Sequence, residues 1–86
     1  MIKIVIITPQ WNNEISDWTE EQGNKIHEWF TLNSFEIPFV PQVGMMIDLD
    51  DFFDCEEILN EIDVNLGYVT VKQIVIGKND IALHCI

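Results

Sequence analysis

The residues best suited to chemistry in this sequence are carboxylates, and the densest group of them falls in the middle of the chain. This group comprises Asp48, Asp50, Asp51 and Asp54. An EF-hand calcium loop needs oxygen ligands at its first, third and fifth positions, Gly at the sixth and Glu at the twelfth. Counted from Asp48, the fifth and sixth residues are Phe52 and Phe53, and the twelfth is Leu59. The pattern therefore fails for calcium. A capped helix start explains the aspartates through the helix dipole, with a weak cation site as the alternative.

Histidine and cysteine could form a metal site or a nucleophile and base pair. The four residues of these types are His27, His84, Cys55 and Cys85. Adjacent His84 and Cys85 would point to opposite faces of a strand, so both cannot reach one ion. Cys85 with His27 would need a cationic or helix N-terminal setting to activate the thiol, and the last strand offers neither. Because G-x-S-x-G, H-E-x-x-H and phosphate-loop motifs are also missing, we expect no metal, no cofactor, no catalytic residue and no enzyme activity.

The charge balance is strongly acidic. Fifteen Asp and Glu stand against four Lys and Arg, which gives a formal net charge of −11 at pH 7. The cations are widely separated lysines with no arginine, namely Lys3, Lys25, Lys72 and Lys78. Direct binding to nucleic acid or to an anionic membrane requires clustered basic residues and is therefore not expected. An acidic balance suits a basic partner or cations, or it serves solubility alone.

The compartment can be predicted from the N-terminal segment and the cysteines. Residues 1–7 are apolar but too short for the core of a signal peptide, and Pro9 follows without a small-residue cleavage site. No apolar run approaches the length that spans a bilayer. Two cysteines without metal-type spacing are ordinary reduced thiols in the cytoplasm, which is the expected location.

Two aromatic residues fall in segments that are predicted to be loops. Trp11 lies in a polar stretch, and Phe39 lies between Pro38 and Pro41. Exposed loop aromatics are typical anchors for a binding partner, although either ring could fold back over a small core. We therefore include Trp11 and Phe39 among the candidate partner-binding residues.

The clearest helix signal covers residues 51–64. Apolar residues recur there in steps of three and four, at Phe52, Cys55, Leu59, Ile62 and Leu66. Acidic residues occupy the opposite side, at Asp51, Asp54, Glu57 and Glu61. The pattern predicts an amphipathic helix whose exposed acidic line is a second candidate partner-binding surface.

A second helix is possible near residues 19–28. Thr19 and Gln22 have the spacing of a capping box, and acidic residues follow Thr19 in the favourable first turn. Gly23 weakens this helix, so an ordered loop is the alternative. Strands are predicted over residues 2–7, 29–37 and 43–49 from β-branched and aromatic enrichment.

The last segment predicts a β-hairpin. Residues 68–76 and 81–86 are rich in β-formers and flank a turn at 77–80. The apolar phase of the first arm changes from Val69 and Val71 to Ile74 and Ile76, and a β-bulge near residues 72–73 would put all four on the core side.

These elements predict a single α+β domain over residues 1–86. About five strands with short connections favour a small, strongly curved antiparallel sheet, packed by the acidic helix 51–64. The run Pro41-Gln42-Val43-Gly44 before an alternating strand is similar to the start of small SH3-like barrels, so an SH3-like partial barrel is the other form of this prediction.

The function that suits this chain best is a non-enzymatic protein-interaction module or accessory subunit, because small sheets recruit partners through edges and grooves. One alternative is an acidic decoy that inhibits a basic, nucleic-acid-binding protein, which requires exposed carboxylates in a row. Another is a small hydrolase or cation-dependent enzyme completed by oligomerisation, which requires His27 or His84 in a pocket with carboxylate neighbours. The partner is expected to be a protein, and a homo-oligomer is compatible with the sequence.

Overall fold

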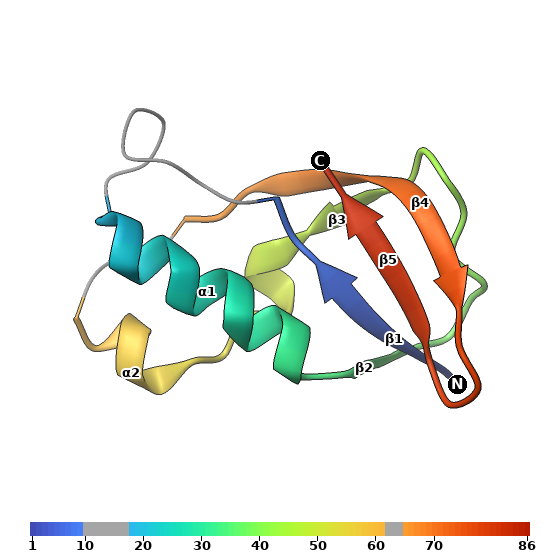
Figure 1. Ribbon diagram of the computed structural model, residues 1–86, viewed down its shortest axis with the longest axis horizontal. Coiled ribbons are helices and arrows are strands. Elements are labelled where there is room, and N and C mark those ends of the chain that lie inside the picture. Colours follow the sequence, from blue (N-terminus) through green and yellow to red (C-terminus); the bar gives the residue numbers. More distant parts are fainter. Residues whose placement is uncertain (10–17, 62–64) are drawn as a thin grey trace.

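The computed structural model describes residues 1–9, 18–61 and 65–86, which form an α+β fold built on one curled sheet (Figure 1). The strands are β1 Ile2–Ile7, β2 Phe35–Ile37, β3 Met46–Asp48, β4 Tyr68–Ile76 and β5 Ile81–Cys85. The helices are α1 Glu20–Leu32 and α2 Glu56–Leu59, with a 3-10 turn at Leu49–Asp51. The strand order is β2-β1-β5-β4-β3, and the sheet curls strongly into a half-barrel. The predicted α+β class and curved, five-stranded partial barrel are confirmed.

The sheet is mixed, so the prediction of an antiparallel sheet is wrong for one strand pair. β1 runs parallel to β5, with Ile4 opposite Ile81 and Ile7 opposite His84, while the other neighbouring strands are antiparallel. Strands inside parallel sheets are commonly apolar on both faces, as β1 is. The strand predicted over residues 2–7 is confirmed, and it lies inside the sheet with a neighbour on each side.

The C-terminal hairpin and its bulge are confirmed. The pairing of β4 with β5 shifts register between Val71 and Gln73, where a bulge was expected. The shift lets Val71 and Ile74 both face the core, since Val71 is buried and Ile74 packs against the buried cluster. The expectation is wrong for Ile76, which extends beyond the core at the end of β4 and is 79% exposed.

Helix α1 begins at the predicted capping box. The Thr19 hydroxyl accepts a hydrogen bond from the Gln22 N–H (3.2 Å), and the Gln22 side chain accepts one from the Thr19 N–H (2.9 Å). The helix continues to Leu32, so the strand predicted over 29–37 is wrong except at Phe35–Ile37. Ile26 and Phe30, one helical turn apart, are fully buried. Their packing outweighs the β-propensity of the aromatic residues, as tertiary contacts commonly do.

The predicted acidic helix 51–64 is wrong. In its place the chain forms the 3-10 turn Leu49–Asp51, an extended link and the single-turn helix α2, and residues 62–64 lie outside the described part. The buried side chains here are Leu49, Phe53 and Ile58, whose spacing does not fit one helical face. Leu59, which was expected to be buried, is 42% exposed, whereas Ile58 is 1% exposed.

A carboxylate fixes this irregular segment to the start of β4. Asp50 accepts hydrogen bonds from the backbone N–H groups of Leu66 (2.9 Å) and Gly67 (3.1 Å). Gly67 has a φ of 71°, a left-handed conformation that favours glycine. Asp50 therefore connects the 3-10 turn to the loop before β4. These hydrogen bonds explain why residues 48–54 do not continue as a helix.

The core lies between the sheet and the helices, with an aromatic cluster at the helical end. Phe30 and Phe53 are buried and stack with ring centroids 5.6 Å apart, and Trp29 contacts both at 5.0 Å. Phe52 packs on Phe35 at 5.1 Å. Trp29 and Phe52 are half-buried and pack against this buried cluster. Among the described helices, none has the length and apolar character needed to cross a membrane.

Candidate functional site

The structure distributes the predicted partner-binding residues over separate segments. Trp11 lies outside the described residues. Phe39, in the connection between β2 and β3, is 51% exposed. The predicted carboxylates are all exposed, at Asp51, Asp54, Glu57 and Glu61. Because they belong to the 3-10 turn, the extended link, α2 and the residues after it, they do not form a line along one helix.

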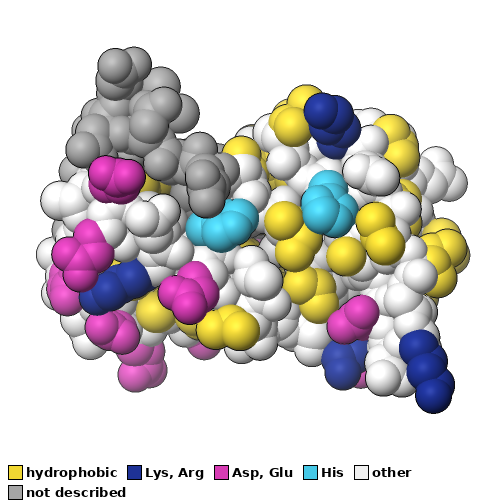
Figure 2. All heavy atoms as spheres, in the orientation of Figure 1, with side chains coloured by type: hydrophobic (Ala, Val, Ile, Leu, Met, Phe, Trp, Pro, Cys, Tyr) yellow, Lys and Arg dark blue, Asp and Glu magenta, His cyan; other side chains and the backbone are white. Residues whose placement is uncertain are grey.

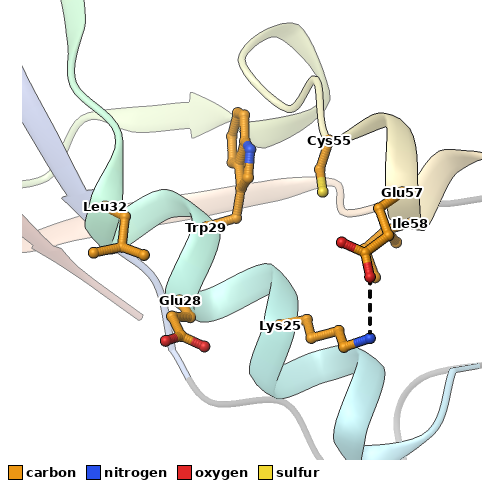
Figure 3. Close-up of a pocket in the computed structure, with 7 residues that line it drawn as sticks. All are labelled: Lys25, Glu28, Trp29, Leu32, Cys55, Glu57 and Ile58. Carbon is orange, nitrogen blue, oxygen red and sulfur yellow. Dashed lines mark hydrogen bonds and ion pairs between the residues drawn. The ribbon is translucent and has the colours of Figure 1, made fainter.

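A groove between α1 and α2 brings part of this acidic set together with apolar side chains (Figure 3). Its volume is about 210 Å³. Helix α1 contributes Lys25, Glu28, Trp29 and Leu32, and the second wall contributes Cys55, Glu57 and Ile58. The α1 residues are three, one and three positions apart, so they share one helical face.

The inner surface of the groove is apolar. Trp29 reaches it from α1, and the Cys55 sulfur points into the space between the helices (Figure 3). Ile58 is buried beneath, and Leu32 is 77% exposed at the end of α1. An exposed leucine beside a half-buried tryptophan offers apolar area that a partner could cover.

The edges of the groove are acidic, with a lysine that is already paired. Lys25 Nζ lies 3.4 Å from Glu57 Oε1, which joins the two walls. The hydrogen bond and the charge of Glu57 raise the pKa of Lys25, and the charges of Glu21 and Glu61 add to this effect. These glutamates therefore lie close to Lys25, and Glu28 lines the same groove. We call Glu21, Glu28, Glu57 and Glu61 the acidic rim.

Only two of the four glutamates of the acidic rim were expected from the sequence to belong to a partner-binding surface. Glu57 and Glu61 were predicted to be exposed, whereas Glu21 was expected only as an acidic residue in the first turn of a helix and Glu28 was not singled out. A usable signal was present, because Glu21, Lys25, Glu28 and Leu32 follow steps of four, three and four. What the sequence could not supply was the second wall, since α2 approaches α1 only in the folded chain.

The histidines and cysteines do not meet at this groove. The His27 ring nitrogen Nδ1 shares a 3.0 Å hydrogen bond with the hydroxyl of buried Thr8, which joins α1 to the end of β1. His84 lies on β5. Burial raises the pKa of the Cys85 thiol to about 11, which opposes formation of the thiolate that a nucleophile requires. Within residues 1–9, 18–61 and 65–86, no three metal-ligating side chains come together.

The sheet presents a second surface on the side away from the core. By strand alternation and register the central part of this outer face consists of Val5, Ile7, Thr70, Gln73, Val75, Ala82, His84 and Ile86. This central part contains no Asp or Glu, whereas the charged residues Lys3, Glu36 and Asp48 occupy the margins of the same face. Figure 2 shows hydrophobic side chains gathered over the sheet and acidic ones mainly over the helices.

No protein family, curated protein or solved structure with which the chain was compared matches it.

Proposed function

We propose that this chain is a non-enzymatic protein-interaction module whose groove binds a basic segment of a partner protein. The observation that carries this proposal is an apolar groove between α1 and α2 with an acidic rim, in which Lys25 is already paired with Glu57. A complementary segment places an apolar side chain against Trp29 and sets Lys or Arg residues beside the rim carboxylates.

The size of the groove supports a side chain rather than a metabolite as its occupant. Pockets for drug-sized ligands occupy roughly 300–1,000 Å³, and this groove has about 210 Å³. A single leucine or aromatic anchor suits such a space, as in peptide recognition by apolar grooves. The acidic rim then contributes orientation and a faster encounter with a basic partner.

A reducing compartment such as the cytoplasm is part of this proposal. Both cysteines are free thiols, and Cys85 is buried. Free thiols in a small acidic domain are ordinary where glutathione keeps cysteines reduced. The chain would act there as an accessory subunit or adaptor that recognises a partner without changing it chemically.

Cysteine labelling gives a direct test, because Cys55 lines the groove and Cys85 does not. The probe is a short synthetic peptide with one Leu or Trp between lysines, and the control peptide has glutamates in place of the lysines. Alkylation of Cys55 by iodoacetamide should slow several-fold with the basic peptide and should not slow with the control peptide, while buried Cys85 should stay largely unlabelled in both. Unchanged labelling of Cys55 at saturating peptide would overturn the proposal.

Carboxylate variants sharpen the same test. Glu28→Gln and Glu57→Gln should each lower the affinity for the basic peptide by about threefold at low salt, since a rim charge contributes modestly to affinity. Glu36→Gln is the matched control, because Glu36 is also exposed but lies on β2, away from the groove. Equal weakening by all of these variants would mean that net charge, and not the groove, attracts the peptide.

A second candidate is the acidic decoy that occupies a basic, nucleic-acid-binding surface. It is favoured by the gathering of acidic side chains over the helical end (Figure 2), although Asp51, Asp54, Glu57 and Glu61 do not form the expected row along one helix. A decoy should displace DNA from a basic binding protein, whereas a groove binder should compete only with apolar-anchored peptides. Displacement of DNA that persists in Trp29→Ala would support the decoy over the groove.

A further inference from the structure

Strand β4 has an edge that is only half covered. β3 pairs with β4 through Tyr68, Val69 and Thr70. The covered part ends at Val71, whose N–H donates to the Met45 carbonyl and whose carbonyl accepts from the Gly44 N–H, both at 2.8 Å. From Lys72 to Ile76 no described strand pairs with β4 on this side. Unpaired strand edges are templates for the addition of another strand.

The backbone groups that face this open edge can be assigned from the hairpin ladder. The Gly77 N–H donates to the Asp80 carbonyl at 2.9 Å, next to the pair Ile76 and Ile81. Hydrogen-bonded and non-hydrogen-bonded pairs alternate along an antiparallel ladder, so Val75 bonds to Ala82. The N–H and C=O groups of Ile74 and Ile76 consequently point away from β5, toward the open edge.

We propose that a second copy of this chain pairs antiparallel with β4 along this open edge. With Ile74 of one copy opposite Ile76 of the other, the outward N–H and C=O groups of both residues find partners on the facing strand. The arrangement is two-fold symmetric, because the same edge serves both copies. The two half-barrels join into one continuous sheet.

The charge distribution favours this edge as the place where two acidic chains meet. Residues 65–79 contain Lys72 and Lys78 but no Asp or Glu, although the chain has a net charge of −11. The helices, where acidic side chains gather, and the tip of the β4–β5 hairpin lie toward opposite ends of the molecule (Figure 1). Pairing through β4 therefore keeps the most acidic parts of the two copies apart.

The side chains beside the edge add apolar area to the pairing. Ile76 is 79% exposed and Val75 is 44% exposed. In the register given above, Val75 of one copy lies opposite Val75 of the other on the outer side of the sheet. A cross-strand pair of β-branched residues stabilises an antiparallel sheet, in addition to the backbone bonds.

Sedimentation equilibrium on the intact chain tests the proposal. The monomer mass is 10.0 kDa, and the average mass should rise toward twice that value between micromolar and millimolar concentration. Association should strengthen with salt, because salt screens the repulsion between two acidic chains. A mass that stays at 10.0 kDa at all concentrations and salt levels would overturn the proposal. The same result would be found if the β4 edge pairs with a strand of another protein, and that outcome also contradicts a second copy as the partner.

A substitution at Ile76 tests the outward backbone hydrogen bond without changing the bonds between β4 and β5. Ile76→Pro removes an N–H that the β4–β5 ladder does not use, and prolines are tolerated where the N–H faces away from the sheet. The matched control, Ile76→Thr, keeps both the N–H and the β-branched shape. The Pro variant should weaken association by about tenfold or more, and the Thr variant much less. Equal weakening by the two variants would contradict pairing through the backbone.

Two further measurements test pairing through β4 where Ile76→Pro disturbs the fold or where the groove could contribute to association. If Ile76→Pro lowers the circular dichroism signal of the folded state, amide exchange in the unmodified chain replaces it. The amides of Ile74 and Ile76 should then exchange more slowly as concentration rises, and concentration-independent exchange would contradict the dimer. Glu28→Gln should leave association through β4 intact, so failure of the groove proposal and failure of this one remain distinguishable.

Discussion

The helical end and the outer face of the sheet differ in how much of the protein's negative charge they carry. At the helical end, carboxylates surround an apolar groove, and Lys25 is paired with Glu57. On the outer face, neighbouring positions of β1, β5 and β4 are apolar or neutral, and charge is confined to the margins. A high net charge therefore need not be spread evenly, and its absence from one face is as informative as its concentration on another.

The comparison also separates two kinds of association by their response to salt. A basic partner at the acidic rim is attracted by charge and should bind more weakly as salt rises. A second copy at the β4 edge is repelled by charge and should bind more strongly. Opposite salt responses in one protein would be difficult to explain by net charge alone.

The largest expected effect tests how the helical end is fastened to the sheet. Ile58→Ala should lower the free energy of unfolding by about 2–5 kcal/mol, because Ile58 is 1% exposed and a cavity would remain. Leu59→Ala is the matched control on the same helix, and with 42% exposure it should cost about 1 kcal/mol or less. Urea unfolding measures both, and equal losses would contradict the structure of residues 56–59.

A somewhat smaller effect is expected in the sheet, where Cys85 on β5 should make the free energy of unfolding depend on pH. Burial raises the pKa of this thiol from its usual 9.0 to about 11 in the folded chain. Above pH 9 the unfolded chain releases the proton while the folded chain keeps it. The associated stability is therefore complete below pH 9 and is lost as the pH rises toward 11, amounting to about 1–2 kcal/mol after solvent screening.

Urea unfolding between pH 8 and about pH 11 checks this dependence in variants of each thiol. Cys85→Ala should remove most of the decline in stability with pH, whereas Cys55→Ala leaves Cys85 in place and should retain it. Parallel curves for Cys85→Ala and the unmodified chain would show that Cys85 does not cause the decline.

The smallest expected effect returns to the helical end. Thr19→Ala removes both the hydroxyl that accepts from Gln22 and the reciprocal order of the capping box, and should cost about 1 kcal/mol. Thr19→Asp preserves a capping oxygen and should restore most of the loss. Thermal unfolding followed by circular dichroism compares the two variants. A loss in Thr19→Ala as large as that in Ile58→Ala would contradict this ranking, because the cap would then contribute as much as a buried core side chain.

Features set by neighbouring residues could be predicted from the sequence. The capping box at Thr19 and Gln22 and the bulge between Val71 and Gln73 each follow from a few adjacent side chains. The hairpin was equally clear, because β-formers flank a turn of four polar or flexible residues. In these places the local preference of the backbone and the final packing agree.

Features set by distant contacts could not be predicted. Residues 51–64 have helical periodicity, but Asp50 bonds to the backbone at Leu66 and Gly67, and Phe53 joins the aromatic cluster with Phe30. The parallel direction of β1 and β5 likewise depends on the whole chain between them. The same limit applies to the groove, whose acidic rim combines α1 with residues far along the sequence.

Strand β5 has a consequence for how this protein reaches its folded state. It lies at the centre of the sheet, between β1 and β4, although it is the last strand along the sequence. Without it, the sheet is split into the pair β1–β2, on which α1 packs, and the pair β3–β4, and no described strand connects the two. During synthesis the edge of β1 that β5 covers therefore stays unpaired until residues 81–85 leave the ribosome. An unpaired strand edge is a template for pairing with another chain, and insertion of β5 removes it.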